Sequence, residues 1–317
     1  MKNLNKIVHL FLNNLTDLSG KTVLAGFSGG ADSTALLDIL VQKKDFFKFN
    51  LKAVFFSHGN SPIAQDEHLM RDFCQQFCEQ HAIELIEMDL NLEKIPRQGW
   101  ESSGRQARLE FYKNMQADFV FLGHHQDDQN ETTMTQLFRG AGKAASGMKK
   151  MDGIYCRPFL DIHKKDIYAY LQNKQISWVE DPTNTDTYFT RNFWRNTGLP
   201  TIAQHYPNYS QSLENFRQKY SELHALSYEL AINDGLERLL EQQPISIENL
   251  NAKRLKNLLT HYFSAQQTHA EDSFYEQQIA HYLANGEAHI NLNEHTLFLK
   301  KGMMHTQPLT VSKKPKF

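Results

Sequence analysis

The stretch VLAGFSGGADSTALLDIL, residues 23–40, decides the fold. An apolar run is followed by Gly29 and Gly30, and a helical pattern begins near Ser33. A strand, a glycine turn and a helix in this order direct backbone N–H groups and the positive end of the helix dipole at one spot, which favours phosphate binding. The loop carries Asp32 where a lysine is common, so we expect a hydrated Mg²⁺ between this carboxylate and the phosphates. The alternative interpretation is that Asp32 or Ser33 only caps the helix.

The chain around this stretch alternates short apolar runs with helical patterns as far as about residue 200. Strands are expected at 22–27, 51–57, 84–89 and 119–123, and helices at 33–42, 63–81, 104–114, 127–138 and 164–174. Apolar strands that alternate with helices pair in parallel through right-handed crossovers. The predicted fold class is therefore α/β, with a doubly wound, mostly parallel sheet.

The pattern changes after residue 205. A long helical stretch is expected over 211–242, with Gly235 as its weak point. Further helices are expected near 251–262 and 274–285, and strands near 288–292 and 296–300. We therefore predict a catalytic domain over 1–205, a helical linker over 206–242, and a small α+β C-terminal domain over 243–317.

Composition restricts the classes of function. The 317 residues carry a formal net charge of −2, so the chain lacks the strongly positive net charge that is typical of many nucleic-acid-binding proteins. Three cysteines are too few for a disulfide framework. Cys74 and Cys78 lie one helical turn apart, which predicts a buried helix face, with a redox or metal pair as the alternative. Lysines and arginines outnumber acids locally over 139–165 and 295–317, which is compatible with RNA binding or with a solvated surface. The chain has no apolar run long enough for a membrane span or a signal peptide, and we expect a cytoplasmic protein.

A second motif follows the last predicted strand, in FVFLGHHQDDQNETTMTQLFRG at 119–140. Asp128 and Glu131 are three residues apart, so they share one face of the expected helix near its N-terminus. Such a pair suits Mg²⁺ or a substrate ammonium group, although acidic residues also stabilise any helix start. A zinc site built from His124 and Asp128 is a further alternative. In doubly wound sheets, ligands bind at this carboxyl end of the strands.

These motifs resemble a known group of enzymes. The S-G-G-x-D-S loop is similar to that of the N-type ATP pyrophosphatases, or PP-loop family, and G-H-H-x-D-D-Q-x-E-T resembles the signature of the tRNA(Ile)-lysidine synthetases. Further stretches of that family occur in order, namely FSHGN (56–60), ESSGRQAR (101–108), RGAGKAASGM (139–148), RPFL (157–160) and EDPTNTDTYFTRNFWR (180–195). The likeness covers residues 20–200, and the remainder resembles a short form with one C-terminal tRNA-binding domain.

The resemblance implies a ligase that forms a carbon–nitrogen bond on tRNA. ATP would adenylate C2 of the wobble cytidine in a CAU-anticodon isoleucine tRNA, and free L-lysine would displace AMP to give lysidine. The expected cofactors are ATP and Mg²⁺, and the expected partners are this tRNA, free lysine and a second copy of the chain, with no membrane. The base must leave its stack, which is easiest in a single-stranded anticodon loop.

The resemblance also implies roles for individual residues. The nucleotide would be held by Ser28, Gly29, Gly30, Asp32, Ser33, His58, Gly123 and His124. The metal would be held by Asp32 and Asp128, and catalysis would involve Asp32, Asp128, Glu131 and Arg195. The substrate RNA or the adenylate would be contacted by Arg105, Arg108, Arg157, Arg191 and Asn192. Each arginine could equally form a surface ion pair.

Three other functions fit part of the pattern. A tRNA thiolase shares the loop but needs reactive cysteines, and the chain has no C-x-x-C. A small-molecule amidating ligase of the NAD or GMP synthetase kind would not need the appended domain. A non-enzymatic ATP sensor would leave the acidic cluster at 127–131 unexplained. Dependence of ATP turnover on an RNA substrate would separate these alternatives from the ligase.

Overall fold

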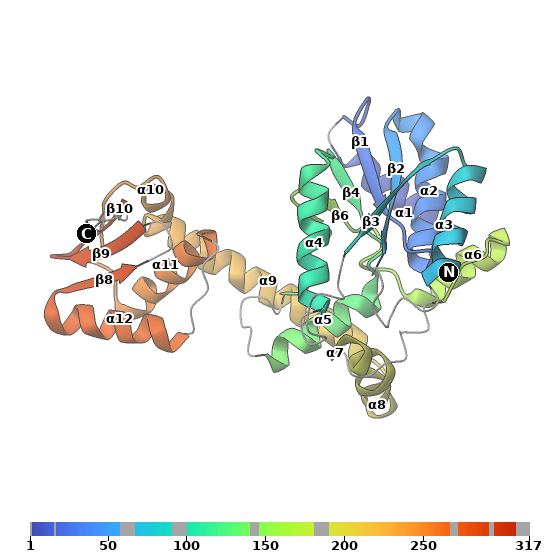
Figure 1. Ribbon diagram of the computed structural model, residues 1–317. Coiled ribbons are helices and arrows are strands. Elements are labelled where there is room, and N and C mark those ends of the chain that lie inside the picture. The colour runs from blue at the N-terminus through green and yellow to red at the C-terminus, as the bar shows by residue number, and fades with distance from the viewer. Residues whose placement is uncertain are drawn as a thin grey trace, which may run out of the picture. The chain divides into compact units, whose positions relative to one another are not determined.

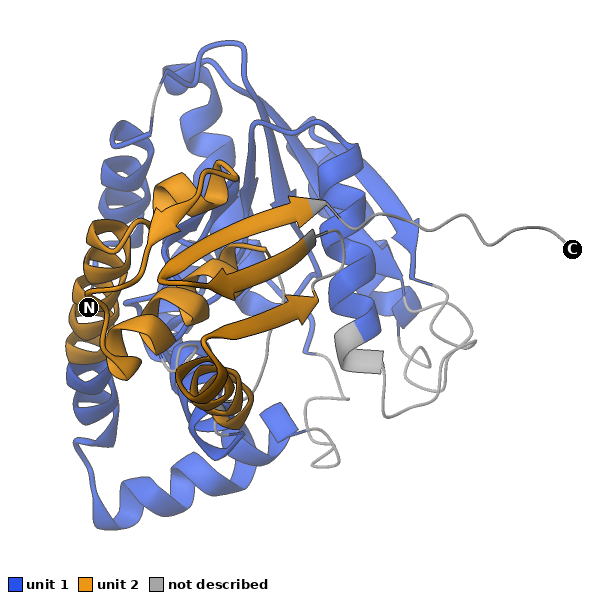
Figure 2. Cartoon of the chain, turned by 90° about the vertical axis from the view of Figure 1, so that its left-hand side faces the viewer, with its two compact units in different colours: residues 1–217 blue, residues 218–317 orange. Residues whose placement is uncertain are grey.

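The computed structural model of the chain describes residues 2–15, 17–57, 67–90, 100–139, 146–180, 190–266, 272–291 and 295–308. The chain divides into two compact units, residues 1–217 and 218–317 (Figure 2). Among the described residues, no helix combines the length and the apolar character that crossing a membrane requires.

The first unit is built on a six-stranded sheet (Figure 1). Its strands are β1 (Thr22–Gly26), β2 (Asn50–Ser57), β3 (Glu84–Asp89), β4 (Phe119–Phe121), β5 (Met151–Asp152) and β6 (Tyr155–Cys156). The order across the sheet is β3-β2-β1-β4-β6-β5, and every neighbouring pair is parallel except β5 with β6. The chain leaves β1 toward β2 and β3 and returns to β4 on the other side of β1. The β1–β4 pair is therefore the switch point of the sheet, where a ligand site is expected.

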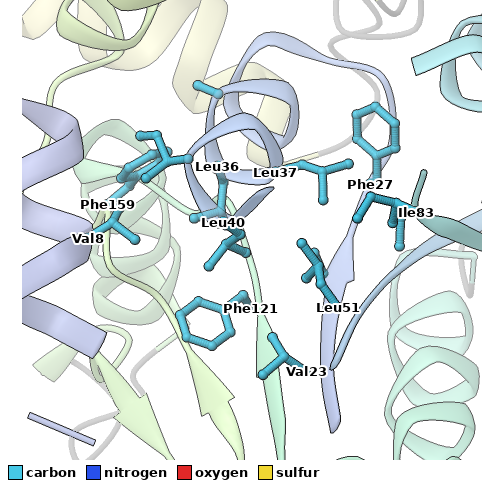
Figure 3. Packing of buried hydrophobic residues seen from close by; sticks show 14 of the residues in the cluster. Val8, Val23, Phe27, Leu36, Leu37, Leu40, Leu51, Ile83, Phe121 and Phe159 are labelled. Atoms are coloured by element: carbon cyan, nitrogen blue, oxygen red, sulfur yellow. The ribbon is translucent and has the colours of Figure 1, made fainter. Parts of the chain in front are cut away.

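Helices cover both faces of this sheet, as the doubly wound prediction requires. The helices are α1 (Leu4–Asn13), α2 (Ala31–Phe47), α3 (Glu67–Gln80), α4 (Trp100–Asn114), α5 (Gln126–Phe138) and α6 (Lys164–Lys174). Val23 and Phe121 of the strands pack with Leu36, Leu37 and Leu40 of α2 (Figure 3). Val23 and Ala25 of β1 belong to the cluster on the α2 face, whereas Leu24 between them packs on the opposite face in a separate cluster with Tyr112 of α4. This alternation is the period-2 pattern of a sheet that is buried on both faces.

The cysteine pair belongs to this core. Cys74 and Cys78 of α3 are 0% and 2% exposed and lie beside Phe77, which confirms the buried helix face. Burial raises the pKa of the Cys78 thiol to about 12. These thiols are therefore packing groups at neutral pH.

Three short elements and one long helix follow the sheet. They are α7 (Thr190–Phe193), the π-helical turn η6 (Trp194–Gly198), α8 (Leu199–His205) and α9 (Tyr209–Asn233). The expected weak point is found at Gly235, whose φ is +101° and whose position begins the separate helix α10 (Leu236–Leu240). The helix α9 continues across residue 217, where the two units divide, and the predicted domain limits at 205 and 242 stay predictions.

The second unit packs helices on one face of a four-stranded antiparallel sheet. Its strands are β7 (Ile245–Ser246), β8 (Glu287–Asn291), β9 (His295–Lys300) and β10 (Met303–Pro308), in the order β7-β10-β9-β8. Its helices α11 (Ala252–Ala265) and α12 (Asp272–Asn285) share with α10 a core that includes Leu258, Leu297 and Met304. The α+β prediction for this part of the chain is confirmed, although β7 and β10 were missing from it.

Candidate active site

The loop between β1 and α2 has the geometry of an anion cradle. Gly29 has φ +79°, and a Cβ atom there would lie 3.2 Å from the Phe73 ring and 3.3 Å from Cys74 Sγ. Gly30 is the N-cap of α2 and makes no side-chain cap hydrogen bond. Because the helix begins at Ala31, Asp32 and Ser33 lie inside its first turn and do not cap it. The first backbone N–H groups of α2 therefore remain available to a ligand anion.

Hydroxyl groups fix the shape of this loop. The backbone N–H of Ser28 donates to Ser33 Oγ at 3.2 Å, and Ser33 Oγ donates to the Gly30 carbonyl at 3.0 Å. Thr34 Oγ1 donates to the same carbonyl at 2.9 Å. The two serine hydroxyls are 3.2 Å apart. The loop is thus preorganised by its own side chains.

The neighbouring strand β4 brings the second motif against this loop. A Cβ atom on Gly123 would lie 3.0 Å from the Asp32 carbonyl carbon and 3.1 Å from the Ser33 nitrogen, so only glycine allows this approach of β4 to α2. His125 is the N-cap of α5, and its Nδ1 accepts from the Asp127 N–H at 3.2 Å. The sequence motif therefore places a second helix N-terminus beside the first, at the switch point of the sheet.

His125 links the two motifs. Its Nε2 lies 3.4 Å from Asp32 Oδ2 and 3.7 Å from Asp128 Oδ2, and the residue is 1% exposed. Burial lowers the pKa of His125, but the carboxylates of Asp128, Asp32 and Asp127 together outweigh it and raise the pKa. Since Nδ1 accepts a backbone hydrogen bond, we assign the ring proton to Nε2, which faces Asp32. Asp32 Oδ1 is buried and has no hydrogen-bond partner.

Asp128 and Glu131 form a compact ionic cluster with two arginines from about 60 residues further along the chain. Arg191 Nε lies 2.7 Å from Glu131 Oε2, and Arg195 Nε lies 2.7 Å from Glu131 Oε1. The Nη2 atoms of Arg191 and Arg195 lie 2.7 and 3.0 Å from the same Oδ1 of Asp128. The two arginines are four residues apart on α7 and η6, and π-helical turns are frequent at functional sites. The cluster holds two carboxylates and two guanidinium groups, so its charges balance.

The charges of this cluster keep the Asp128 carboxyl ionised. Burial favours the neutral form of Asp128, but Arg191, His125, His124 and Arg195 together hold the pKa of this carboxyl well below its usual range. Its Oδ2 also accepts from the backbone N–H of His125 at 2.9 Å. Asp128 stays an anion at neutral pH, and a carboxylate with so low a pKa is a poor general base.

A cationic group lies next to the cluster, at the ends of β4 and β6. Arg157, which directly follows β6, is 4% exposed, and its Nη1 donates to the Lys149 carbonyl at 3.0 Å. The Nε of Arg157 and the Nδ1 of His124 are both buried without a hydrogen-bond partner. Burial, with the charges of Arg191, Arg157 and Arg105, lowers the pKa of His124 to about 3, so its imidazole is neutral. A buried polar atom without a partner is uncommon in proteins, so each of these two atoms is a candidate contact for a polar ligand.

The helix α5 carries further polar residues that the sequence did not single out. Gln129 donates to the Met148 carbonyl and accepts from the Met148 N–H, both at 2.7 Å. Asn130, which is fully buried, donates to Ser210 Oγ at 2.9 Å and accepts from Arg217 Nη1 at 3.0 Å. Each residue ties a different segment to α5. The sequence did not predict these contacts, because a hydropathy pattern predicts which apolar residues are buried but not which polar side chains form buried hydrogen bonds.

The structure brings some of the predicted site residues together, and others lie apart or outside the described residues. Asp32, His124, Asp128, Glu131, Arg157, Arg191 and Arg195 converge at the carboxyl ends of β1, β4 and β6. Arg105 is exposed on α4 and acts on His124 through its charge, whereas Arg108 and Asn192 are half-buried. His58 lies outside the described residues, as do 140–145 of the glycine-rich stretch and 181–189 of the later motif. Within the described residues, no group of three or more His, Cys, Asp or Glu side chains is arranged as a metal site, so the zinc alternative has no third ligand there.

The amino-acid sequence is similar to a known domain family and to several curated proteins. The PP-loop domain family matches residues 2–202. A tRNA(Ile)-lysidine synthase of Nitrosomonas europaea is 32% identical over 84% of this chain and 60% of its own length. A second, from Hydrogenovibrio crunogenus, is 30% identical over 82% of this chain and 62% of its own length. The chain thus spans about three fifths of the length of these curated relatives.

A solved structure supports the fold. The U34-tRNA thiolase NcsA from Methanococcus maripaludis, with its [4Fe-4S] cluster, matches with a TM-score of 0.55 and 18% sequence identity. The match covers 69% of this chain and 78% of that chain. At this identity the likeness concerns the fold alone.

Proposed function

The chain belongs to the PP-loop domain family, and from this premise we propose that it is an ATP-dependent tRNA(Ile)-lysidine synthase. The proposed reaction converts the wobble cytidine of a CAU-anticodon isoleucine tRNA to lysidine, with AMP and pyrophosphate as the other products. The carrying observation is the convergence at the β1–β4 switch point of a phosphate loop and an ion-paired carboxylate cluster.

The first step is adenylation of the base. The O2 atom of the cytidine attacks the α-phosphorus of ATP, and pyrophosphate leaves. The N–H groups of the first turn of α2 suit the departing pyrophosphate, because they are positively polarised and lie in a loop whose shape is held by the Ser28 and Ser33 hydrogen bonds. The buried Nε of Arg157 is a donor for a phosphate or for the base.

The second step is attack by lysine. The lysine ε-ammonium group first loses a proton to solvent. The resulting amine bonds to C2 and then loses a second proton, and the C2–O bond breaks so that AMP leaves with the oxygen. Asp128 and Glu131 are anionic acceptors suited to the ammonium group of the incoming lysine, and Arg191 and Arg195 are the cations that it must displace or join. We assign these carboxylates to binding and orientation, since the depressed pKa of Asp128 makes it a weak base.

Mg²⁺ is part of the proposal, and the residues present fit it. Asp32 Oδ1 is buried without a hydrogen-bond partner at the helix start that would hold the phosphates, and a carboxylate oxygen is a suitable Mg²⁺ ligand. Asp128 Oδ1 already accepts from both arginines, whereas Oδ2 accepts one backbone N–H, so a part for Asp128 in metal binding would fall to Oδ2. When bound, the ion would neutralise the charge that develops on the leaving pyrophosphate.

The cysteines argue against the thiolase alternative. Cys156 is 0% exposed, and burial raises the pKa of its thiol to about 12, as burial also does for Cys78. A sulfur carrier needs an accessible thiolate, which burial of this kind prevents. Free lysine, the isoleucine tRNA and a second copy of the chain remain the partners that we propose.

The test measures lysine incorporation. Pure protein is mixed with ATP, Mg²⁺, radiolabelled lysine and an unmodified CAU-anticodon isoleucine tRNA transcript, and RNA-bound label is counted after mild alkali, which removes aminoacyl esters. We expect alkali-stable label that is absent with a methionine tRNA. Asp32→Asn should abolish it, whereas the control Asp45→Asn, an exposed position on the same helix, should retain it. Pyrophosphate release without label would refute lysine as the nucleophile, and the absence of both products would refute the ligase.

A further inference from the structure

The side chain of Gln129, near the start of α5, holds the backbone of a single residue further along the chain. Its amide nitrogen donates to the Met148 carbonyl at 2.7 Å, and its amide oxygen accepts from the Met148 N–H at 2.7 Å. One amide thus satisfies both backbone groups of Met148, as a neighbouring strand would. Gln129 is 7% exposed, so water competes little for these two bonds.

The preceding residue, Gly147, shows how closely the chain approaches this amide. Its φ is +74°, and a Cβ atom there would lie 2.6 Å from Gln129 Oε1 and 2.9 Å from Arg217 Cδ. A side chain at position 147 would therefore force the amide of Gln129 or the side chain of Arg217 to move. The contact thus depends on glycine at this position, and it holds the backbone of residues 147–148 against α5.

The segment that Gln129 holds carries the hydrogen-bond acceptor of Arg157. The carbonyl of Lys149, the residue after Met148, accepts from Arg157 Nη1 at 3.0 Å. The carbonyl of Lys150 accepts from the Arg157 backbone N–H at 2.8 Å, which continues the pairing of β5 with β6. Within the described residues, the bond to Lys149 is the only hydrogen bond of the Arg157 side chain. It is therefore the polar contact that orients the guanidinium.

The orientation of this guanidinium matters because Arg157 lies at the carboxyl end of β6, beside the candidate site, and its Nε is buried without a partner. The N–H donors of a guanidinium form a rigid planar fork, so a bond at one Nη restricts where Nε can point. A ligand oxygen gains most from donors that are in place before it binds. Gln129 lies between Asp128 and Glu131, so one turn of α5 places the carboxylates directly and the cation through residues 148–149.

We propose that Gln129 is a positioning residue for the adenylation step, and that it acts by holding the Lys149 carbonyl where the Arg157 guanidinium requires it. The proposal rests on the proposed function, in which Arg157 donates to a phosphate or to the base. In this role Gln129 acts through the backbone of residues 148–149 and need not touch a ligand. Its replacement should therefore slow adenylation only as far as Arg157 is misplaced.

A double-mutant cycle on the full chain tests this role. Pyrophosphate release with ATP, saturating lysine and the CAU-anticodon tRNA transcript is measured for Gln129→Met, Arg157→Met and the double variant. Gln129→Met keeps the length of the side chain and removes both hydrogen bonds, and we expect it to lower kcat by about 10- to 100-fold. The double variant should be no slower than Arg157→Met, because without the guanidinium nothing is left for Gln129 to position. KM for lysine should stay unchanged.

Gln136→Met is the matched control, because Gln136 has the same side chain on the same helix and its Oε1 makes no hydrogen bond. It should retain wild-type rates. Circular dichroism melting establishes that each variant is folded. Arg157→Lys, which keeps the charge but not the planar fork, takes the place of Arg157→Met if that variant does not fold. Losses that multiply in the double variant, or a raised KM for lysine in Gln129→Met, would show that Gln129 only stabilises α5 and would overturn the proposal.

A second measurement needs no turnover and separates this proposal from the proposed function. In isotope-labelled protein without ligands, the nuclear magnetic resonance signal of the Arg157 Nε–H group is assigned by its loss in the Arg157 variant. We expect this signal to shift or broaden in Gln129→Met and to stay in place in Gln136→Met. An unchanged signal in Gln129→Met would refute the positioning role even if the wild type incorporates lysine. A changed signal with no pyrophosphate release by the wild type would support the positioning of Arg157 and refute the ligase.

Discussion

Replacement of Glu131 by glutamine tests whether the carboxylate–guanidinium cluster is both a structural and a binding element. Glu131 is 1% exposed and accepts from the Nε atoms of Arg191 and Arg195 at 2.7 Å each. Glutamine has nearly the same shape but only one acceptor oxygen, and its NH₂ group would face a guanidinium. The variant leaves two cations against Asp128 alone, so the cluster gains one unbalanced positive charge.

The magnitude follows from the burial of the partners. Loss of one member of a fully buried ion pair costs about 3–5 kcal/mol. The arginine side chains are 38% and 26% exposed, so water screens part of this penalty. We therefore expect Glu131→Gln to lower the free energy of unfolding by about 2 kcal/mol. Adding Arg191→Met restores charge balance and should recover about 1 kcal/mol of that loss.

Urea unfolding followed by circular dichroism measures this prediction, with Glu110→Gln on an exposed position of α4 as the control. In lysine incorporation, Glu131→Gln should raise KM for lysine at least tenfold and leave the affinity for ATP unchanged, because the hydrogen bonds of Glu131 go to Arg191 and Arg195 on α7 and η6. A loss of stability below about 0.5 kcal/mol, or no recovery in the double variant, would refute the idea that the four charges act as a unit.

Three further predictions concern neighbouring residues. His124, with its pKa lowered to about 3, contributes stability that is present above its ordinary pKa of about 6.5 and is lost as the pH falls toward 3. Urea titrations at pH 7 and pH 5 should therefore show a loss of about 1–2 kcal/mol that His124→Asn does not share, and parallel losses would contradict it. Gly123→Ala should weaken ATP binding at least tenfold by calorimetry, because its Cβ would meet the backbone of Asp32 at 3.0 Å; wild-type affinity would show that α2 can yield. Arg217→Met should cost about 1–3 kcal/mol in thermal unfolding, since it leaves Asn130 Oδ1 and Thr133 Oγ1 without their buried donor, and an unchanged unfolding free energy would show that those bonds contribute nothing.

Local pattern was sufficient to predict most of the sheet. The strands β1 to β4 lie where apolar runs predicted them, and helix α6 has the predicted bounds. The short strand β6 was missing because Tyr155 and Cys156 carry no alternation of their own. They form a strand only because β4 offers an edge for pairing. The turn η6 was missing for a similar reason, since its length is too short for periodicity to register.

The sequence and the resemblance named the residues of the candidate site, but they did not predict which carboxylate pairs with which arginine. The sequence placed Asp128 and Glu131 on one helix face, and the resemblance named Arg191 and Arg195. That each arginine contacts both carboxylates depends on the path of some 60 intervening residues. The hydrogen bonds of Gln129 and Asn130 likewise depend on tertiary contacts, which no short-range pattern encodes.

The start of α5 has a consequence for how this protein can change. Residues 128–131 are buried and polar, and they connect in turn to η6, to the segment before β5 and to α9, so one helical turn serves as a junction for distant parts of the first unit. A junction of this kind leaves little freedom for substitution, since an exchange at any of these four residues weakens the attachment of a distant segment. Altered substrate preference, whether evolved or engineered, would accordingly be sought in the segments that dock on this turn, while the turn itself is kept as a fixed template.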